Sequence, residues 1–438
     1  MCDTFFISKE MTMNGKNIFA KNSDREPNEA QQIQRFPSVE RPSGFVKCTF
    51  ITVPFVGKTN EIIVSKPFQM WGVEMGLNEF GLAIGNEAIF SKLKSKRSNT
   101  GLTGMDMNRL VLETCKTAKE GLQFLIYLLE KYGQDACGGY TDSRFFYDNS
   151  FLIADTNEAY VLETAGSFWA FEKIKGFRAI SNRLTIETEF DGIHVEAQDF
   201  ALKKGWVKKQ EKFSFAKAFN SPLMTMLAKG KERKILCETK QSVFEKIELF
   251  QVFQILRSHN IETNFHPCNS KMDSLCLHAS GLLTPSQTTG SMVVELDQNL
   301  KSPVWLTGSS APCLSIFKPF YFGSTFLNEE NFIIPTAFQD DSYWWKWEKW
   351  HRLALKKYGN WISNFTQERD ALERYLLDKS NEQNTKTDLF LLSEYSINSS
   401  LQFIEKWMKK IKEKDKSGNS WSYNFFWNRL NKKVKMDL

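Results

Sequence analysis

The chain of 438 residues contains no uninterrupted run of eighteen apolar side chains. A transmembrane helix needs about 20 such residues, so no membrane span is predicted. The first residues, MCDTFFISKEMTMNGK, also lack the basic stretch and following apolar run that mark a secretory signal. The sequence therefore predicts a soluble, cytoplasmic protein, and its hydrophobic content of 42% is enough for a large core.

Several catalytic signatures are missing too. The chain has no G-x-S-x-G elbow, no H-E-x-x-H zinc pair, no phosphate-binding GxxxxGK[ST] loop and no dinucleotide-binding GxGxxG. No metal, nucleotide or other cofactor is therefore expected. Among five scattered histidines, His278 has a cysteine close by, Cys276. On one strand the two side chains point the same way, which is as typical of a buried pair as of a Cys–His dyad.

The eight cysteines include no CxxC pair, and seven of them are expected to be reduced and structural. Cys2 differs, because it directly follows Met1. If Met1 is removed, Cys2 carries both a thiol with a pKa of about 8.5 and an α-amine with a pKa of about 7.7–8.0. One residue then supplies nucleophile and base, the arrangement that N-terminal-nucleophile enzymes use to cleave amides. An ordinary N-terminal residue is the alternative interpretation.

The formal net charge of +6 is concentrated at one end of the chain. Residues 401–438 contain nine Lys and one Arg against four acidic residues, so the first 400 residues are neutral overall. No nucleic-acid partner is therefore expected. Aromatic residues alternate with lysines in this tail, which could contact an anionic membrane surface or a protein partner. A helix docked on its own domain is the favoured alternative.

The order of predicted elements indicates an α+β fold with antiparallel sheets. Helical spacing predicts helices over 105–118 and 119–132, with Thr103 and Thr117 as N-caps and Gly133 as the stop. A third helix is predicted over 241–258. Short strand-like runs separated by Gly, Asn and Pro occupy 2–7, 17–20, 49–53, 61–65, 71–77, 82–86, 151–155, 159–163, 168–173, 178–181 and 291–296.

The chain divides into three parts by composition. Residues 1–335 form a catalytic domain, 336–400 a helical extension packed on it, and 401–438 the basic, aromatic-rich tail, expected to be helical. Within the first part, the sequence from Asn78 to Gly81 has the chemistry of a hairpin turn, which would place Asn86 at the end of the returning strand. Asn182 follows another predicted strand. Either amide could donate to an oxyanion, although asparagines are also common in turns.

Several stretches of the sequence together resemble the secernin group, which belongs to the dipeptidase branch of the N-terminal-nucleophile cysteine hydrolases. This branch is related to the penicillin V and bile-salt amidases. The resemblance runs from the start to about residue 375. It rests on CDTF at 2–5, FAKNSDR at 19–25, KCT at 47–49, WGVEMG at 71–76, GNEA at 85–88, LEKYGQ at 129–134, NSFLIAD at 149–155, LETAG at 162–166, ISN at 180–182 and SQTTGSM at 286–292.

The resemblance implies a four-layer αββα sandwich whose first strand delivers Cys2 to a cleft. Cys2 would be the nucleophile, Asp24 would orient its α-amine, and Asn86 and Asn182 would stabilise the oxyanion. Lys21 stands where the related amidases carry an arginine, so it would supply charge rather than a planar fork. Arg233 matches a further basic residue of the amidases, although the surrounding run 229–234 could equally be a solvated loop.

The activity implied is acyl transfer from a small peptide to Cys2, with dipeptides as the usual substrates of the group. Two other functions are compatible with the same sequence. An amidase for a non-peptide acyl group would need the same catalytic residues, and a non-enzymatic role in regulated secretion or partner binding would use the tail. A capped Cys2 would remove the base and leave an inactive hydrolase fold.

Overall fold

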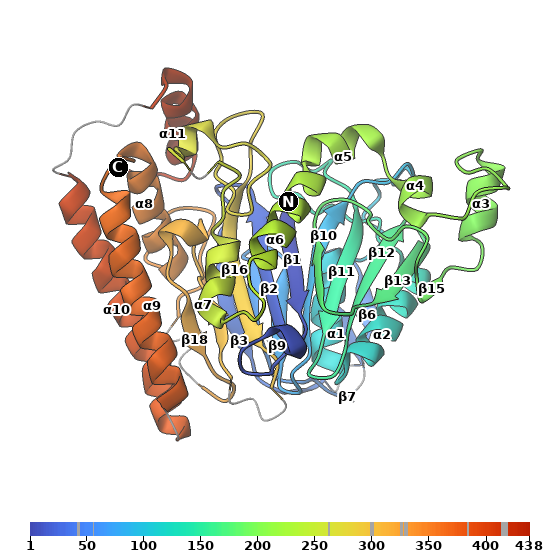
Figure 1. The fold of residues 1–438 in the computed structure, drawn as a ribbon, viewed down its shortest axis with the longest axis horizontal. Coiled ribbons are helices and arrows are strands. Elements are labelled where there is room, and N and C mark those ends of the chain that lie inside the picture. Colours follow the sequence, from blue (N-terminus) through green and yellow to red (C-terminus); the bar gives the residue numbers. More distant parts are fainter. Residues whose placement is uncertain are drawn as a thin grey trace.

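A computed structural model describes residues 1–41, 44–55, 57–261, 263–297, 302–324, 327, 332–382, 385–412 and 419–438. In this part of the chain, two large antiparallel sheets lie face to face (Figure 1). The first has the order β14 (Phe177–Ile180), β1 (Cys2–Ile7), β2 (Ile18–Arg25), β16 (Gln287–Glu295), β17 (Val304–Leu306) and β18 (Lys318–Phe320). The second has the order β15 (Gly192–Ile193), β13 (Phe168–Lys173), β12 (Ala159–Ala165), β11 (Asp148–Ala154), β10 (Ala83–Ile89), β9 (Met75–Asn78), β8 (Ile62–Pro67) and β3 (Gln31–Phe36).

Helices cover the outer faces of both sheets. The helices are α1 (Gly104–Thr114), α2 (Ala118–Tyr132), α3 (Ala197–Lys203), α4 (Phe215–Phe219), α5 (Pro222–Ala228), α6 (Gly230–Ser242), α7 (Leu249–Leu256), α8 (Tyr343–Lys356), α9 (Ile362–Glu382), α10 (Lys386–Lys412) and α11 (Trp421–Lys433), with 3-10 turns η1 (Lys9–Met11), η2 (Pro267–Asn269) and η3 (Pro312–Leu314). Two small hairpins pair β4 (Glu40–Arg41) with β7 (Gly57–Lys58) and β5 (Phe45–Lys47) with β6 (Thr52–Pro54).

The layers confirm the predicted α+β, αββα architecture. α1 and α2 pack on the second sheet, whereas α6 and α7 pack on the first, and β1 contacts β10 and β11 across the interface between the sheets. Apolar side chains form two large buried clusters. One extends from the space between the sheets through the first sheet to helices α7–α11, and the other lies between the second sheet and α1 with α2. Among the described residues, no helix combines the length and the apolar character needed to cross a bilayer.

Local signals in the sequence set the starts of the first two helices as predicted, although the first helix ends at Thr114 rather than at 118. The Thr103 hydroxyl accepts from the Asp106 backbone N–H at 3.0 Å, while the Asp106 carboxylate accepts from the Thr103 N–H. Thr117 caps α2, and Gly133 ends it with a φ of 66°, a conformation that favours glycine. The predicted hairpin is also present, since β9 pairs with β10 and Gly81 donates to Asn78 O.

Several predicted positions differ from the structure. The strands predicted from 49 and from 71 begin at Thr52 (β6) and Met75 (β9). The helix expected over 241–258 is interrupted, because α6 ends at Ser242 and α7 begins at Leu249. Asn86 lies in the middle of β10 rather than at its end, since β10 continues to Ile89 to pair with β11. The boundary predicted between 400 and 401 falls inside α10.

The last helix, α11, docks on the body of the protein. Tyr423 and Trp427 are buried on it, and the Arg352 guanidinium lies 5.3 Å from the Trp427 ring centre. Beyond the helix, the Val434 carbonyl accepts from the Gln339 N–H at 3.0 Å. Figure 1 places this helix beside α8. The apolar face of α11 is therefore packed against the body of the protein, within the basic tail.

Candidate active site

Pairing of β1 with β2 fixes the position of Cys2. The two strands run antiparallel with Cys2 opposite Ser23, so that Met1 and Asp24 lie side by side. The Met1 ammonium donates to Asp24 O, and the Asp24 N–H donates to Met1 O, both at 2.7 Å. The Cys2 side chain is 6% exposed and lines a cleft of about 790 Å³. The nucleophile predicted from the sequence therefore lies at the inner wall of a cavity large enough for a small substrate.

The backbone nitrogen of Cys2 is held by Asn182, which follows β14. The Cys2 N–H donates to Asn182 Oδ1 at 2.9 Å, and the amide Nδ2 donates to Ala88 O at 2.8 Å. The carbonyl end of the Asn182 amide thus faces the atom that becomes the α-amine once Met1 is removed. This geometry favours orientation of the amine over the oxyanion-donor role predicted for Asn182.

Asp24 lies on β2 beside the same atoms. Its Oδ1 accepts from the Thr288 hydroxyl at 2.6 Å, whereas Oδ2 is buried without a partner among the described residues. Burial raises the pKa of Asp24 to about 6, and the nearby terminal ammonium opposes that increase. A carboxylate with one free oxygen at this place can accept a hydrogen bond from an amine or ammonium group.

A pH profile tests this assignment of Asp24. The ionised carboxylate accepts at both oxygens, whereas the protonated group carries a donor O–H, so kcat/KM is expected to show a second acid limb, below that of the α-amine, as the pH decreases through about 6, where Asp24 becomes protonated. Asp24→Asn should reduce kcat/KM and lack that acid limb. The exposed Asp199 on α3 provides a matched control, and Asp199→Asn should keep the wild-type profile. An unchanged acid limb in Asp24→Asn would contradict the assignment.

Lys21 lies fully buried beneath the nucleophile. Its Nζ donates to Asn86 O at 2.7 Å and to Glu87 Oε1 at 3.1 Å, and the Thr4 hydroxyl donates to the same carboxylate oxygen. Burial alone would lower the pKa of Lys21, but the negative charges available at Cys2 and Glu87 raise it overall. The ammonium is therefore retained at neutral pH, as the resemblance implied for this position.

The Cys2 thiol responds to the same surroundings. Burial raises its pKa to about 11, with the Lys21 ammonium opposing the increase and the Glu74 carboxylate adding to it. The thiol lies 3.8 Å from Glu74 Oε2, to which it can donate. With Met1 still attached, the sulfur is consequently a protonated thiol, and a base next to it is needed to form the nucleophile.

Asn86 projects from β10 into the cleft. Its Oδ1 accepts from Asn108 Nδ2 at 2.7 Å, and its own Nδ2 donates to Asn149 Oδ1 at 2.9 Å. The remaining interaction of Nδ2 is a 3.7 Å contact with the Met105 sulfur, a weak acceptor. A substrate oxygen could replace that sulfur. Gly104 makes room for the amide, because a Cβ there would lie 2.5 Å from Asn86 Nδ2.

Arg233 forms the other side of the site. It is fully buried on α6, so the alternative of a solvated loop for 229–234 was wrong. The guanidinium makes two hydrogen bonds to the Asp3 carboxylate at 2.9 and 3.1 Å, and it also donates to Ser181 Oγ at 3.0 Å and to Asn182 Oδ1. Arg233 therefore fixes the residue that holds the Cys2 nitrogen, without lining the cleft itself.

Sequence reasoning missed three residues that line or support the cleft. Glu74 contacts the Cys2 sulfur, Arg25 pairs with Glu74 at 3.2 Å, and Thr288 orients Asp24. All three lie within stretches that carry the family resemblance, but no local pattern distinguishes a single carboxylate or hydroxyl from its neighbours. Arg25 directly follows Asp24, and this adjacency to a predicted site residue was the one signal in the sequence that pointed to any of the three.

The cleft has a charged floor and an apolar mouth. Asp24, Arg25, Glu26, Glu29 and Glu74 line the part near Cys2. Helices α5 and α11 contribute to the outer part, and its apolar lining includes Phe90, Phe145, Met224, Leu227, Leu282, Leu283, Phe338 and Phe426. The tail predicted to contact a membrane or a partner thus forms one wall of the cleft.

A possible metal-binding group lies elsewhere. Among the described residues, His259, Cys276, His278 and Cys313 place a ligand atom of each within 4.8 Å of one another, and none of them lines the cleft. The Cys276–His278 pair considered from the sequence is therefore part of a larger group, outside the cavity in which Cys2 lies.

One protein-family model matches part of the chain. Residues 11–137, from η1 to just beyond α2, match the family described as acyl-coenzyme A:6-aminopenicillanic acid acyl-transferase. The match covers less than half of the chain and begins after Cys2. It does not extend to the secernin group or to dipeptide cleavage.

Solved structures with a similar arrangement were also found. A C2A mutant of the conjugated bile acid hydrolase from Clostridium perfringens has 12% identity and a TM-score of 0.41, covering 75% of this chain and 94% of its own. Penicillin V acylase from Agrobacterium tumefaciens has 13% identity and a TM-score of 0.43, with 75% and 89% covered. A Caenorhabditis elegans N-acylethanolamine-hydrolyzing acid amidase ortholog has 12% identity and a TM-score of 0.37, with 68% and 94% covered.

Proposed function

We propose that this protein is a cysteine-type hydrolase that cleaves an amide bond of a small peptide after the bond preceding Cys2 has been cut. The observation that carries the proposal is the position of Cys2, whose sulfur lines the cleft while its nitrogen is held by Asn182 Oδ1 at 2.9 Å. Nucleophile and base are thus presented together, and the network of Asn182, Arg233 and Asp24 orients the amine.

The chemistry follows from these positions. The free α-amine accepts the thiol proton, the sulfur attacks the substrate carbonyl carbon, and the carbonyl oxygen takes the negative charge. Asn86 Nδ2 is placed to donate to that oxygen, an interaction typically worth about 2.7–4 kcal/mol in the transition state. The Lys21 ammonium favours the thiolate. When the C–N bond breaks, the ammonium returns its proton to the leaving amine.

Deacylation uses the same groups, with water in place of the thiol as the attacking group. The α-amine takes a proton from water, the hydroxide attacks the thioester carbon, and the C–S bond breaks. The sulfur leaves as a thiolate and recovers its proton from the ammonium, so that Cys2 is regenerated and the acid product is released. Only water is consumed, and no group outside the cleft is required.

Dipeptides are the proposed substrates, as the secernin resemblance implies. Support from the structure is the charged floor, where the Glu29 and Glu74 carboxylates pair with Arg25 and Glu26 also lines the cleft. Zwitterionic ends of a short peptide can form ion pairs with both signs of charge there. The cavity of about 790 Å³ is also in the range of sites that bind small ligands.

An amidase for apolar N-acyl groups is a second candidate, favoured by the mouth of the cleft. Leu282 and Leu283 are 91% and 92% exposed, and Leu227, which also lines the cleft, is 57% exposed. Exposed apolar side chains next to a cavity commonly bind apolar ligand groups. An acyl chain lying against this mouth would place its amide near Cys2.

The first experiment combines mass spectrometry with a substrate panel. We expect the intact mass to show loss of Met1 and an unmodified Cys2, and dipeptides to be cleaved faster than N-acyl amides of matched length. Faster cleavage of the N-acyl series would favour the second candidate. Retained Met1 or a capped Cys2 would contradict the mechanism. A free Cys2 without any hydrolysis would favour a binding role, for which the exposed, stacked Trp421 and Phe425 on α11 are available.

A further inference from the structure

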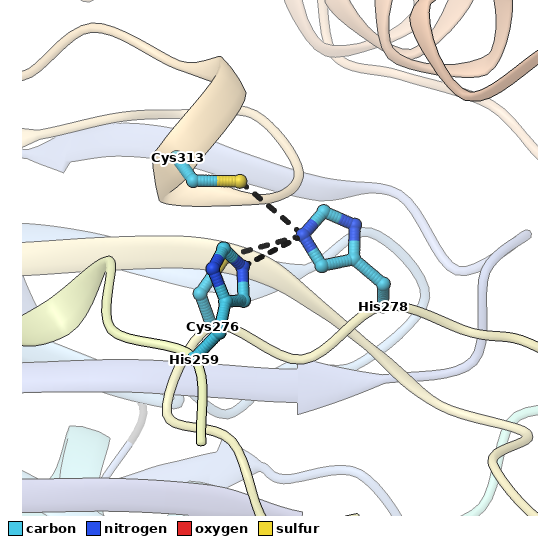
Figure 2. A group of neighbouring side chains, drawn as sticks. All are labelled: His259, Cys276, His278 and Cys313. Carbon is cyan, nitrogen blue, oxygen red and sulfur yellow. Dashed lines mark hydrogen bonds between the residues drawn. The ribbon is translucent and has the colours of Figure 1, made fainter. Parts of the chain in front are cut away.

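Four potential metal ligands converge at a point outside the cleft (Figure 2). His259 lies just after α7, Cys276 and His278 lie in the segment between η2 and β16, and Cys313 lies in η3. Cys276 and His278 are fully buried, and His259 and Cys313 are partly buried. Stacking on Phe265, with ring centres 3.6 Å apart, orients the His259 imidazole.

One ligand atom from each of the other three residues lies close to the Nε2 nitrogen of His278. His278 Nε2 lies 3.3 Å from His259 Nε2, 3.6 Å from Cys276 Sγ and 3.2 Å from Cys313 Sγ. A neutral imidazole nitrogen carries one hydrogen or one lone pair, so it can satisfy only one of the three by hydrogen bonding. The other ring nitrogen of His278, Nδ1, is buried without a partner among the described residues. The polar contacts of this ring are therefore all made by Nε2, the nitrogen that faces the other three ligands.

The three spacings around His278 Nε2 match a tetrahedral ion, and the other ligand atoms lie within 4.8 Å of one another. Zinc bonds of about 2.0–2.1 Å to nitrogen and about 2.3 Å to sulfur place a nitrogen ligand about 3.3–3.6 Å from a neighbouring nitrogen or sulfur, and two sulfurs about 3.8 Å apart. The observed distances of 3.2, 3.3 and 3.6 Å fall close to this range. We propose that His259, Cys276, His278 and Cys313 bind one Zn²⁺ in a structural Cys₂His₂ site.

Charge balance favours the same occupant. Zinc binds thiolates and neutral imidazoles, so two cysteines release two protons and the loaded site has no net charge. A neutral site can be buried without an additional counter-ion. Two cysteines with two histidines in a tetrahedral arrangement also select zinc over Mg²⁺ or Ca²⁺, which prefer oxygen ligands.

The ion would join three segments and support the active site from behind. The Cys276–His278 segment pairs with β16, because Leu277 N donates to Thr288 Oγ1 and Thr288 N donates to Leu277 O, both at 2.9 Å. Thr288 in turn donates to Asp24. The same segment continues to Leu282 and Leu283 at the mouth of the cleft.

The metal content of the purified full-length protein tests this proposal independently of any hydrolase activity. Elemental analysis should give about one zinc per chain, as expected for a four-ligand site. Cys276→Ala and Cys313→Ala should lose the zinc. Cys115 is another buried thiol, placed at the end of α1, and Cys115→Ala should keep it. Cobalt substitution should give the visible absorption of tetrahedral dithiolate Co²⁺ in the wild type and in Cys115→Ala only.

His259→Ala, at a partly exposed ligand, provides a variant with less effect on packing, and it should bind zinc more weakly than the wild type in a competition with a chelating dye. Folded wild-type protein that holds no zinc, and takes none up when zinc is added, would overturn the proposal. An intact mass that shows a Cys276–Cys313 disulfide would also overturn it, as would equal zinc loss in Cys115→Ala.

Discussion

Cys2→Ala is expected to abolish amide hydrolysis while the protein remains folded. Removal of the nucleophile of an enzyme that acts through a covalent intermediate lowers kcat by as much as about 10⁶-fold, so a loss of at least about 10⁴-fold is anticipated. The substitution removes one small buried atom, so we expect a change of about 1 kcal/mol in the free energy of unfolding. Steady-state assays on dipeptides and thermal unfolding measure the two quantities.

Two further variants complete the Cys2 test. Cys2→Ser keeps a side-chain hydroxyl and a free α-amine after removal of Met1, but the hydroxyl is a far poorer nucleophile, so its activity should also be very low. Cys115→Ala removes another buried thiol at a site away from the cleft and should retain wild-type kcat/KM. Comparable hydrolysis by Cys2→Ala and the wild type, with an N-terminus verified by mass, would disprove the role of Cys2.

Arg233→Ala is expected to destabilise the protein by about 3–5 kcal/mol, because it leaves the Asp3 carboxylate buried without its cation. The substitution also removes the hydrogen bonds to Ser181 and Asn182, so the group that holds the Cys2 nitrogen loses its support. Urea unfolding measures the first effect and kcat/KM the second. Arg233→Lys keeps the charge but not the planar fork, so intermediate values are expected.

The pH profile separates this role from simple destabilisation. The Arg233 guanidinium is one of the charges that lower the pKa of Asp24 against the effect of burial. Its removal should raise that pKa further, so the acid limb of kcat/KM should move to higher pH in Arg233→Ala. The exposed Lys231 on the same helix serves as control, and Lys231→Ala should change stability by less than about 0.5 kcal/mol without moving the limb. An acid limb that stays in place would contradict the coupling of Arg233 to Asp24.

Some residues of the candidate site could be predicted from the sequence more readily than others. Cys2, Lys21, Asp24, Asn86 and Asn182 are adjacent to strands with clear patterns, and the structure brings all of them to one region. Arg233 was uncertain, because a basic run on a short helix has the same composition as a solvated loop. Its burial depends on Asp3, which is 230 residues away in the chain.

The roles of individual atoms depended on partners that no local pattern specifies. Asn182 had the chemistry of an oxyanion donor, yet its carbonyl oxygen faces Cys2 because its amide nitrogen is bonded to Ala88 O. Asn86 was placed at a strand end by its hairpin, but pairing with β11 extends β10 beyond it. In both cases a long-range contact outweighed the local preference.

The sequence alone determined the elements whose signals are local. Alternating strands, the hairpin after Asn78, and the caps Thr103 and Thr117 depend on residues within a few positions of one another, and they appear as predicted. Tertiary structure decided which distant residues meet. The Asp24–Thr288 bond, the docking of α11 over the cleft and the convergence of His259, Cys276, His278 and Cys313 join segments far apart in the chain. Such contacts form because two sheets and their helices must bury a common core, and that requirement fixes positions no short stretch of sequence encodes.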